Sequence, residues 1–207
     1  MTTPPGAARA FIFDLDGTLV DTMPTHYRMW QDVAAKYGLD FPETLFYELG
    51  GVPTPKIAAL LLERAGLPHD PVVIAHEKEQ AYVEGLASGA LALAAIEPVV
   101  AIARGLRAER AGPLAVASGS SRRVVENALR TIGITGWFSA VVASEDTVRH
   151  KPEPDVFLEA ARRLGVAPAV CTVYEDTDLG LEAARRAGML GIDVRPIIRE
   201  AKRQLGA

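Results

Sequence analysis

The sequence contains a single cysteine, Cys171, among its 207 residues. An intramolecular disulfide is therefore excluded, which is typical of proteins of the reducing cytoplasm, and we expect a cytoplasmic protein. Cys171 lies in an apolar run, and a small buried side chain on a strand explains it more simply than a reactive thiol does.

Long hydrophobic runs are also absent. The segment that comes nearest to a membrane span, residues 86–100, is interrupted by polar residues, a glycine and a proline. It falls short of the roughly 18 apolar residues that a span requires. The first residues show no basic stretch leading into an apolar one, so we expect neither a signal peptide nor a membrane partner.

Positive charge is scarce too, because 22 Lys and Arg residues face 26 Asp and Glu residues, for a net charge of −4 at pH 7. A broad nucleic-acid surface needs clustered basic residues, so we expect no nucleic-acid partner. A small anionic substrate needs only a few lysines in a cleft and stays possible. No sustained apolar surface pattern stands out, and we expect a monomer.

What the sequence does contain is a repeated alternation of short apolar runs and helix-like segments. The apolar runs cover residues 10–14, 113–118, 140–143, 170–174 and 190–194, and the helix-like segments cover residues 121–131, 154–164 and 179–187. This alternation predicts an α/β fold, a Rossmann-like, mainly parallel sheet with helices on both faces.

One connection breaks the alternation. After the first apolar run, roughly 70 residues pass before the pattern resumes, far more than a crossover of about a dozen residues needs. Helical spacing of apolar residues runs through this segment, and Thr54-Pro55 and Asp70-Pro71 are typical of helix N-termini. We therefore expect an all-helical cap over residues 23–93, inserted into a core made of residues 1–22 and 94–207.

Polar residues follow the predicted strands at the ends where an open α/β sheet binds its ligands. They are Asp14, Asp16, Ser118, Glu175 and Asp176, with Lys151 a little beyond the third strand. Four acids brought together repel one another unless a cation neutralises them, and a set of oxygen ligands suits Mg²⁺. A lysine and a serine beside that ion suit a phosphoryl group.

A simpler alternative treats three of these residues as separate helix caps. Asp16, Ser118 and Asp176 each precede a predicted helix, where short polar side chains are favoured in any protein. For any one residue the two interpretations are about equal. The occurrence of all of them at strand ends, in this order, favours a shared site.

Four segments resemble, in order, the motifs of the haloacid dehalogenase-like hydrolase superfamily. They are residues 14–21 (DLDGTLVD), 117–120 (ASGS), 151–155 (KPEPD) and 175–180 (EDTDLG). The helical insertion after the first motif resembles the β-phosphoglucomutase-like branch of that superfamily. Within the branch, residues 174–189 and 193–195 look most like bacterial fructose-1-phosphate phosphatases.

The resemblance implies a role for each residue. Asp14 would be the nucleophile that forms an aspartyl-phosphate, and Asp16 the acid and base that protonates the leaving sugar oxygen and then deprotonates water. Asp14 and the backbone carbonyl of Asp16 would bind Mg²⁺, with Glu175 and Asp176 completing the metal site. The phosphoryl oxygens would be held by Ser118, Gly119 and Lys151.

In the predicted cap, His26, Lys78 and the loop of residues 50–54, with Gly51, are candidates for contact with the substrate. A histidine at such a place is more often a helix residue with satisfied partners, but His26 matches a family position that helps to align Asp16. Lys78 could belong to a solvated charged face. The loop departs from the mutases, which carry there a basic pair that grips a second phosphate.

The sequence therefore predicts a Mg²⁺-dependent phosphatase of small sugar phosphates, of the fructose 1-phosphate or 6-phosphogluconate type. One alternative is a β-phosphoglucomutase, which uses the same chemistry but returns the phosphoryl group to a sugar. Another is a receiver-like signalling module that carries a phospho-aspartate. The helical insertion and the presence of Asp16, an acid and base suited to turnover, argue against a signalling module.

Overall fold

The computed structural model describes residues 8–50, 52–88 and 90–205. The chain divides into two compact units, the first made of Met1–Asp21 with Ala94–Ala207 and the second of Thr22–Leu93. None of the described helices is both long and apolar enough to cross a bilayer.

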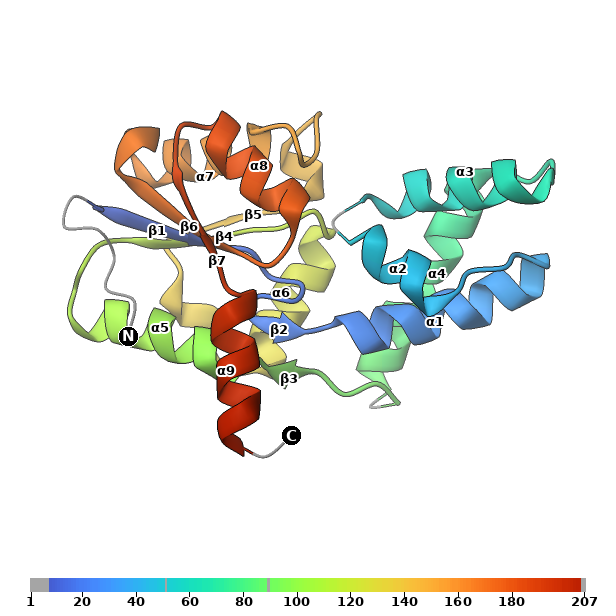
Figure 1. The fold of residues 1–207 in the computed structure, drawn as a ribbon, viewed down its shortest axis with the longest axis horizontal. Coiled ribbons are helices and arrows are strands. Elements are labelled where there is room, and N and C mark those ends of the chain that lie inside the picture. Colours follow the sequence, from blue (N-terminus) through green and yellow to red (C-terminus); the bar gives the residue numbers. More distant parts are fainter. Residues whose placement is uncertain (1–7, 51, 89, 206–207) are drawn as a thin grey trace. The chain divides into compact units, whose positions relative to one another are not determined.

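A five-stranded parallel sheet forms the centre of the first unit (Figure 1). Its strands, in the spatial order β5-β4-β1-β6-β7, are β5 (Ala140–Val142), β4 (Leu114–Ala117), β1 (Ala10–Phe13), β6 (Cys171–Glu175) and β7 (Leu190–Asp193). Strands β1, β4 and β6 are buried along their whole length, which explains their continuous apolar sequences. The predicted fold class is confirmed, and Cys171 lies buried on β6, as expected.

Helices cover both faces of this sheet, with α7 and α8 on one face and α5 on the other (Figure 1). The helices of the unit are α5 (Glu97–Ala108), α6 (Arg122–Thr131), α7 (Asp155–Leu164), α8 (Asp178–Arg186) and α9 (Arg195–Leu205). Short 3₁₀ turns cover Thr135–Trp137, Ser144–Asp146 and Pro168–Val170. Small side chains such as Ala115, Ala160 and Ala183 let α7 and α8 pack closely against the strands.

A short antiparallel ribbon joins the two places where the chain leaves and re-enters the first unit. Strands β2 (Val20–Asp21) and β3 (Ala94–Ala95) pair so that Val20 lies opposite Ala95. The backbone N–H of Ile96 donates to the carbonyl oxygen of Leu19 at 2.9 Å, which extends the pairing by one bond.

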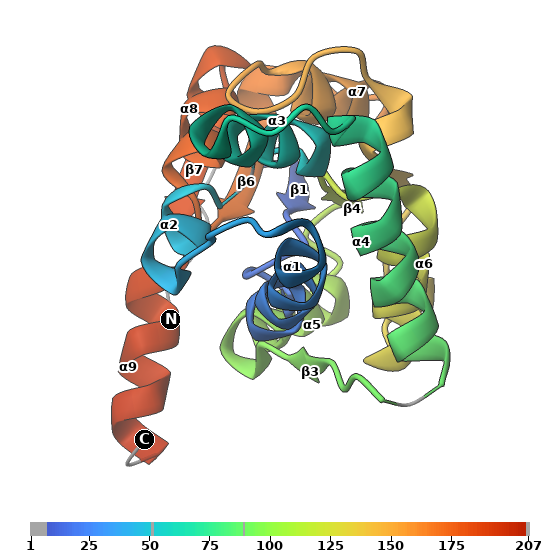
Figure 2. The ribbon, with the colours of Figure 1, turned by 90° about the vertical axis from the view of Figure 1, so that its right-hand side faces the viewer.

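The second unit is the helical insertion (Figure 2). Its helices are α1 (Met23–Tyr37), α2 (Glu43–Glu48), α3 (Thr54–Ala65) and α4 (Pro71–Ala87), with α4 packed against both α1 and α3. Trp30, Phe41 and Phe46 lie at the centre of its core, and the rings of Trp30 and Phe41 meet edge to face at 5.3 Å. Burial of aromatic side chains of this size gives a small helical unit most of its stability.

The two predicted helix starts in this unit have different outcomes. Asp70 caps α4 as expected, because its Oδ1 accepts from the backbone N–H of Val72 at 2.8 Å. Thr54 was expected to cap α3, and this is wrong: Pro53 is the N-cap residue and Thr54 already lies inside the helix. The Thr54 hydroxyl donates to Oε1 of Glu79 at 2.8 Å, a hydrogen bond that the charge of the acceptor strengthens.

Candidate active site

Three neighbouring strands of the sheet end at one edge, and the predicted site residues lie there. Asp14 follows β1, Ser118 follows β4 and Glu175 is the last residue of β6, while β1 is hydrogen-bonded to both other strands. Because the strands are parallel and in close register, these three side chains lie at the same level of the sheet.

Lys151 is bound between two of the predicted acids. Its ammonium donates to Oδ1 of Asp14 at 2.5 Å and to Oε2 of Glu175 at 2.6 Å. All three side chains are buried, so each charge depends on its partners rather than on water. The side chain reaches this place from the loop between β5 and α7, where its Nζ also lies 5.0 Å from the centre of the Phe157 ring.

The acids at this edge carry more negative charge than Lys151 balances. Burial, and then the charge of Glu175, raise the pKa of Asp14 well above its usual range although Lys151 opposes the shift. The same two causes raise the pKa of Asp176 to about 7, against a hydrogen bond from Thr18. Burial alone would lower the pKa of Lys151, but the charges of Asp14 and Glu175 outweigh it and raise that pKa.

This excess of negative charge fits a divalent cation. Asp14, Glu175 and Asp176 each offer a carboxylate oxygen, and these oxygens lie within 4.8 Å of one another. Several hard oxygen ligands are what Mg²⁺ and Ca²⁺ select, and a cation here would relieve the repulsion that raises the two pKa values.

Glu175 differs from the other two acids because both of its oxygens are held by donors of the chain. Oε1 accepts from the backbone N–H groups of Asp176 and Thr177, at 3.2 and 3.0 Å, and from the Thr177 hydroxyl at 2.7 Å. Oε2 accepts from Lys151. The Glu175 side chain therefore fixes the turn before α8 and the position of Lys151, whether or not it also coordinates a metal ion.

Asp16 accepts two hydrogen bonds at a single oxygen. The hydroxyl of Ser118 donates to its Oδ2 at 3.0 Å and the hydroxyl of Ser120 donates to the same atom at 2.7 Å. Ser120 was not among the residues selected from the sequence. The Ser-Gly-Ser spacing after a buried strand is the signal that could have pointed to it, because the Ser118 hydroxyl accepts from the backbone N–H of Ser120 and this turn brings both hydroxyl groups to Asp16.

The interpretation of these residues as separate helix caps is wrong. The N-cap residues of α6 and α8 are Ser121 and Thr177, and the Thr177 hydroxyl accepts from the backbone N–H of Gly180 at 3.0 Å. Ser118 and Asp176 therefore lie one or more residues before the caps. Their side chains turn toward the acid cluster, where Thr18 donates to Oδ1 of Asp176 at 2.8 Å.

Two glycines lie against the acid cluster, and neither was predicted to be part of it. Gly17 has a φ of +84°, and a Cβ built there would overlap the carboxylate of Asp176. A Cβ on Gly180 would overlap the carboxyl group of Glu175. Gly119, predicted to bind phosphate, is exposed between Ser118 and Ser120, and a Cβ there would meet open space.

In the second unit, the structure brings His26 and Lys78 together. The Nζ of Lys78 lies 2.8 Å from Nδ1 of His26 and 3.1 Å from Oε1 of Glu79. The His26 ring stacks on that of Tyr82 with 4.1 Å between the centroids. When Lys78 is charged, its ammonium donates a hydrogen bond to Nδ1, which places the ring hydrogen of His26 on Nε2. Gly51 lies outside the described residues.

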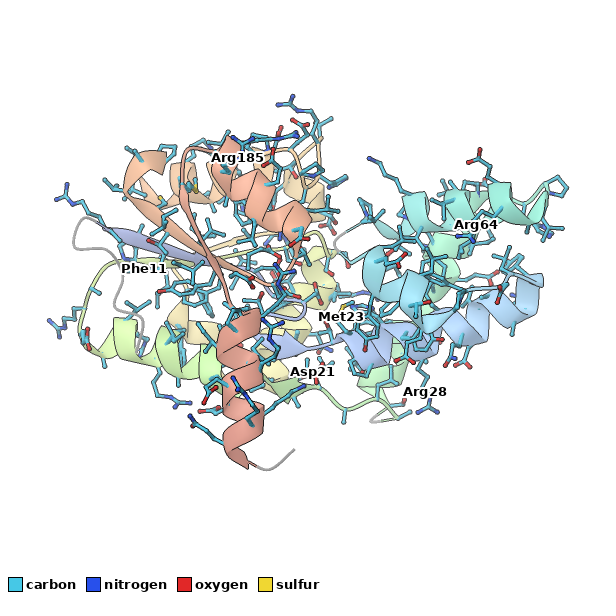
Figure 3. All side chains as sticks on the ribbon, in the orientation of Figure 1. Phe11, Asp21, Met23, Arg28, Arg64 and Arg185 are labelled. Atoms are coloured by element: carbon cyan, nitrogen blue, oxygen red, sulfur yellow. The ribbon has the colours of Figure 1, made fainter. Side chains whose placement is uncertain are left out.

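The remaining charged side chains of the first unit are mostly exposed and paired with one another. Arg185, labelled on α8 in Figure 3, and Arg186 both donate to Glu182, whose pKa falls to about 2 as a result. Such exposed ion pairs add little stability, because water screens them. In this they differ from the buried charges around Lys151.

Comparison with known proteins identifies relatives that align with most of the chain. A family model described as haloacid dehalogenase-like hydrolase matches residues 8–188. The chain is 40% identical over 184 residues to the fructose-1-phosphate phosphatase YqaB of Escherichia coli K12, which covers 89% of this chain and 95% of that protein. It is 30% identical over 184 residues to a phosphorylated carbohydrates phosphatase of Thermotoga maritima, covering 87% of this chain and 82% of the relative.

Among solved structures, a β-phosphoglucomutase from Clostridium difficile is similar to this one. The two align with a TM-score of 0.77 and 23% identity, over 94% of this chain and 98% of the other. At that identity the likeness concerns the fold. It shows that the core and its helical insertion occur together in another enzyme.

Proposed function

Since the chain belongs to the haloacid dehalogenase-like hydrolase family, we propose that it is a Mg²⁺-dependent phosphatase of small sugar phosphates, of the fructose 1-phosphate or 6-phosphogluconate type. The names of the two curated relatives support the substrate class. The observation that carries the chemistry is the contact of Asp14 with Lys151 beside two further acids.

Hydrolysis would proceed in two steps at Asp14. In the first, an Asp14 carboxylate oxygen forms a bond to phosphorus while the bond from phosphorus to the sugar oxygen breaks, and Asp16 gives its proton to that oxygen. In the second, water attacks the phosphorus and gives a proton to Asp16, while the bond between Asp14 and phosphorus breaks. The products are the free sugar and inorganic phosphate, and both aspartates return to their initial states.

The phosphoryl group would be held by Ser118, Gly119 and Lys151. The ammonium of Lys151 lies 2.5 Å from Oδ1 of the proposed nucleophile, so its charge is next to the phosphoryl oxygens throughout the transfer. A fixed positive charge in a buried site stabilises the transition state more than it would in water. The Ser118 hydroxyl and the exposed backbone at Gly119 would supply hydrogen bonds.

The ion would be held by Asp14, Asp176 and the backbone carbonyl of Asp16, with Glu175 completing the site. We favour Asp14 and Asp176 as the direct carboxylate ligands because both oxygens of Glu175 already accept from donors of the chain. When bound, Mg²⁺ keeps Asp14 ionised and offsets the charge of the incoming phosphate.

The helical unit would supply contacts to the sugar. The buried side chains of His26 and Lys78 form one polar cluster with the partly buried Glu79, and the loop of residues 50–54, with Gly51, completes the set proposed from the sequence. Gly50 and Thr54 stand in this loop where a mutase carries a basic pair. The absence of those charges favours release to water over transfer to a second sugar.

Phosphate release from a panel of sugar and polyol phosphates tests the proposal, with Mg²⁺ and with a chelator, for the wild type and Asp14→Asn. We expect release from fructose 1-phosphate or 6-phosphogluconate that the chelator and the substitution both abolish. Conversion of β-glucose 1-phosphate into glucose 6-phosphate, with little free phosphate, would establish the mutase instead. A long-lived phospho-protein with no turnover of any sugar phosphate would favour the signalling module.

A further inference from the structure

Ser118 and Ser120 both donate to Oδ2 of Asp16, but their hydroxyl groups are held differently. The Oγ of Ser118 also accepts from the backbone N–H of Ser120 at 2.9 Å, so this hydroxyl is bound both as donor and as acceptor. The Ser120 hydroxyl donates to Asp16 over the shorter distance, 2.7 Å against 3.0 Å. One carboxylate oxygen is thus shared by two serines from a single turn.

A serine hydroxyl carries one proton and can donate only one strong hydrogen bond at a time. Ser118 lies at the end of β4, where its backbone N–H donates to the carbonyl of Val142 at 3.0 Å, and its side chain is fully buried at the sheet edge. When it donates to a phosphoryl oxygen, it must withdraw its proton from Asp16. The bond from Ser120 then becomes the one of the two that still fixes Asp16.

Ser120 is well placed to keep that bond. Its backbone N–H is tied to Ser118, and its carbonyl oxygen accepts from the backbone N–H of Ser144 at 3.0 Å. The turn is therefore held on both sides, by β4 and by the segment that follows β5. A side chain on so fixed a backbone loses little entropy when it binds.

We propose that the two serines divide the work, with Ser118 binding the phosphoryl group and Ser120 acting as the positioning residue that holds the carboxyl group of Asp16 for proton transfer. The inference rests on the proposed phosphatase function. Ser120 acts through Asp16 and needs no contact of its own with the phosphoryl oxygens.

Substrates with different leaving groups separate the two roles. The sugar oxygen of fructose 1-phosphate needs a proton from Asp16 as it leaves, whereas the phenolate of p-nitrophenyl phosphate does not. Because kcat/KM covers the steps up to the first transfer, its value for the second substrate is independent of that proton. The test variants are Ser120→Ala and Ser120→Thr, the second of which keeps the hydroxyl. The control is Ser144→Ala, because in the described structure the Ser144 hydroxyl donates only to the neighbouring Glu145.

We expect Ser120→Ala to lower kcat/KM for fructose 1-phosphate about tenfold or more, because the lost hydrogen bond is to a carboxyl group that becomes charged as it gives up its proton. Its kcat/KM for p-nitrophenyl phosphate and its inhibition constant for inorganic phosphate should stay at the wild-type values. Ser120→Thr should restore most of the activity and Ser144→Ala should resemble the wild type. Ser118→Ala should weaken inhibition by phosphate and lower both kcat/KM values.

Equal losses on both substrates, or weaker inhibition by phosphate in Ser120→Ala, would show that Ser120 binds the phosphoryl group and would overturn the inference. An unchanged kcat/KM for fructose 1-phosphate in this variant would also overturn it. In each case the wild type still hydrolyses sugar phosphates, so the proposed function stands. A wild type that releases no phosphate from any sugar phosphate would contradict the proposed function itself.

Discussion

Gly180 lies so close to Glu175 that a Cβ at residue 180 would overlap the Glu175 carboxyl group. Glu175 is fully buried and its oxygens bind Lys151 and the turn before α8, so it has no room to withdraw. It is thus the acid cluster, and not the helix α8 itself, that requires a glycine at residue 180.

Gly180→Ala is therefore expected to destabilise the protein although alanine is the better helix former. Helix propensity favours alanine by about 1 kcal/mol, but overpacking a buried site costs about 1–3 kcal/mol and also displaces Glu175. Urea denaturation measures the first effect and phosphate release the second. The matched control is Gly105→Ala in α5, where a Cβ meets open space and the free energy of unfolding should rise. Equal stabilisation by both substitutions would contradict the account.

Lys151→Met is expected to lower kcat for the preferred sugar phosphate by about a hundredfold or more, because it removes a buried charge beside the transferring group. The methionine has a similar length and no charge, so packing against Phe157 is largely kept. Steady-state kinetics measures the loss. Lys36→Met is the control, since the exposed ion pair of Lys36 with Glu77 lies at the surface of the helical unit and should not affect kcat. A kcat near the wild-type value in Lys151→Met would refute the assigned role.

Mg²⁺ is expected to stabilise the folded protein without any substrate present. A ligand that binds only the folded state at 100 times its Kd adds about 2.7 kcal/mol, which appears as a higher Tm. Asp176→Asn should weaken or abolish this shift because it removes a proposed ligand. Thermal denaturation with Mg²⁺ and with a chelator makes the comparison, and Asp178→Asn, an exposed acid two residues away, is the control. A Tm that ignores Mg²⁺ in the wild type would argue against the ion.

Asp70→Ala is expected to destabilise the helical unit by about 1 kcal/mol through loss of the N-cap of α4. Asp70→Asn should retain most of the stability, since asparagine caps helices about as well as aspartate does. Hydrogen exchange of the first turn of α4 locates the effect. Equal losses for the two variants would assign the role of Asp70 to its charge and not to the bond with Val72.

Much of the fold could be predicted from the sequence because strands buried in a parallel sheet have continuous apolar sequences. All five strands of the sheet lie where the runs predicted them, within a residue or two at each end. Helices α5 and α9 were not predicted. Each begins shortly after a strand and has a Pro in its first turn, Pro98 and Pro196, but no element was assigned to either segment from the sequence. The family and an enzyme of the phosphatase type are confirmed by the comparisons.

The charged members of the site were predicted, whereas several of its small ones were missed. Asp14, Lys151 and Glu175 have side chains whose chemistry is visible in isolation, and the structure brings them together. Gly180 matters because Glu175 of the same segment lies against it. Thr18 matters only because a distant segment approaches it, since its partner Asp176 is 158 residues away in the sequence. No local pattern contains that information, since it arises when β1 and β6 pair.

The ribbon of β2 and β3 has a consequence for how such a chain can change over time. Asp21 and Ala94 pair directly, so the insertion begins and ends at adjacent positions on the first unit. For the sheet, the whole insertion is equivalent to a loop whose two ends lie side by side. The entropic cost of bringing the ends of a loop together rises only slowly with the length of the loop. Insertions of very different size could therefore replace this one at the ribbon of β2 and β3 without a change in the strand order or in the edge of the sheet that carries the acid cluster. Under the proposed function, in which the insertion contacts the sugar, substrate preference could diverge independently of the chemistry of the first unit.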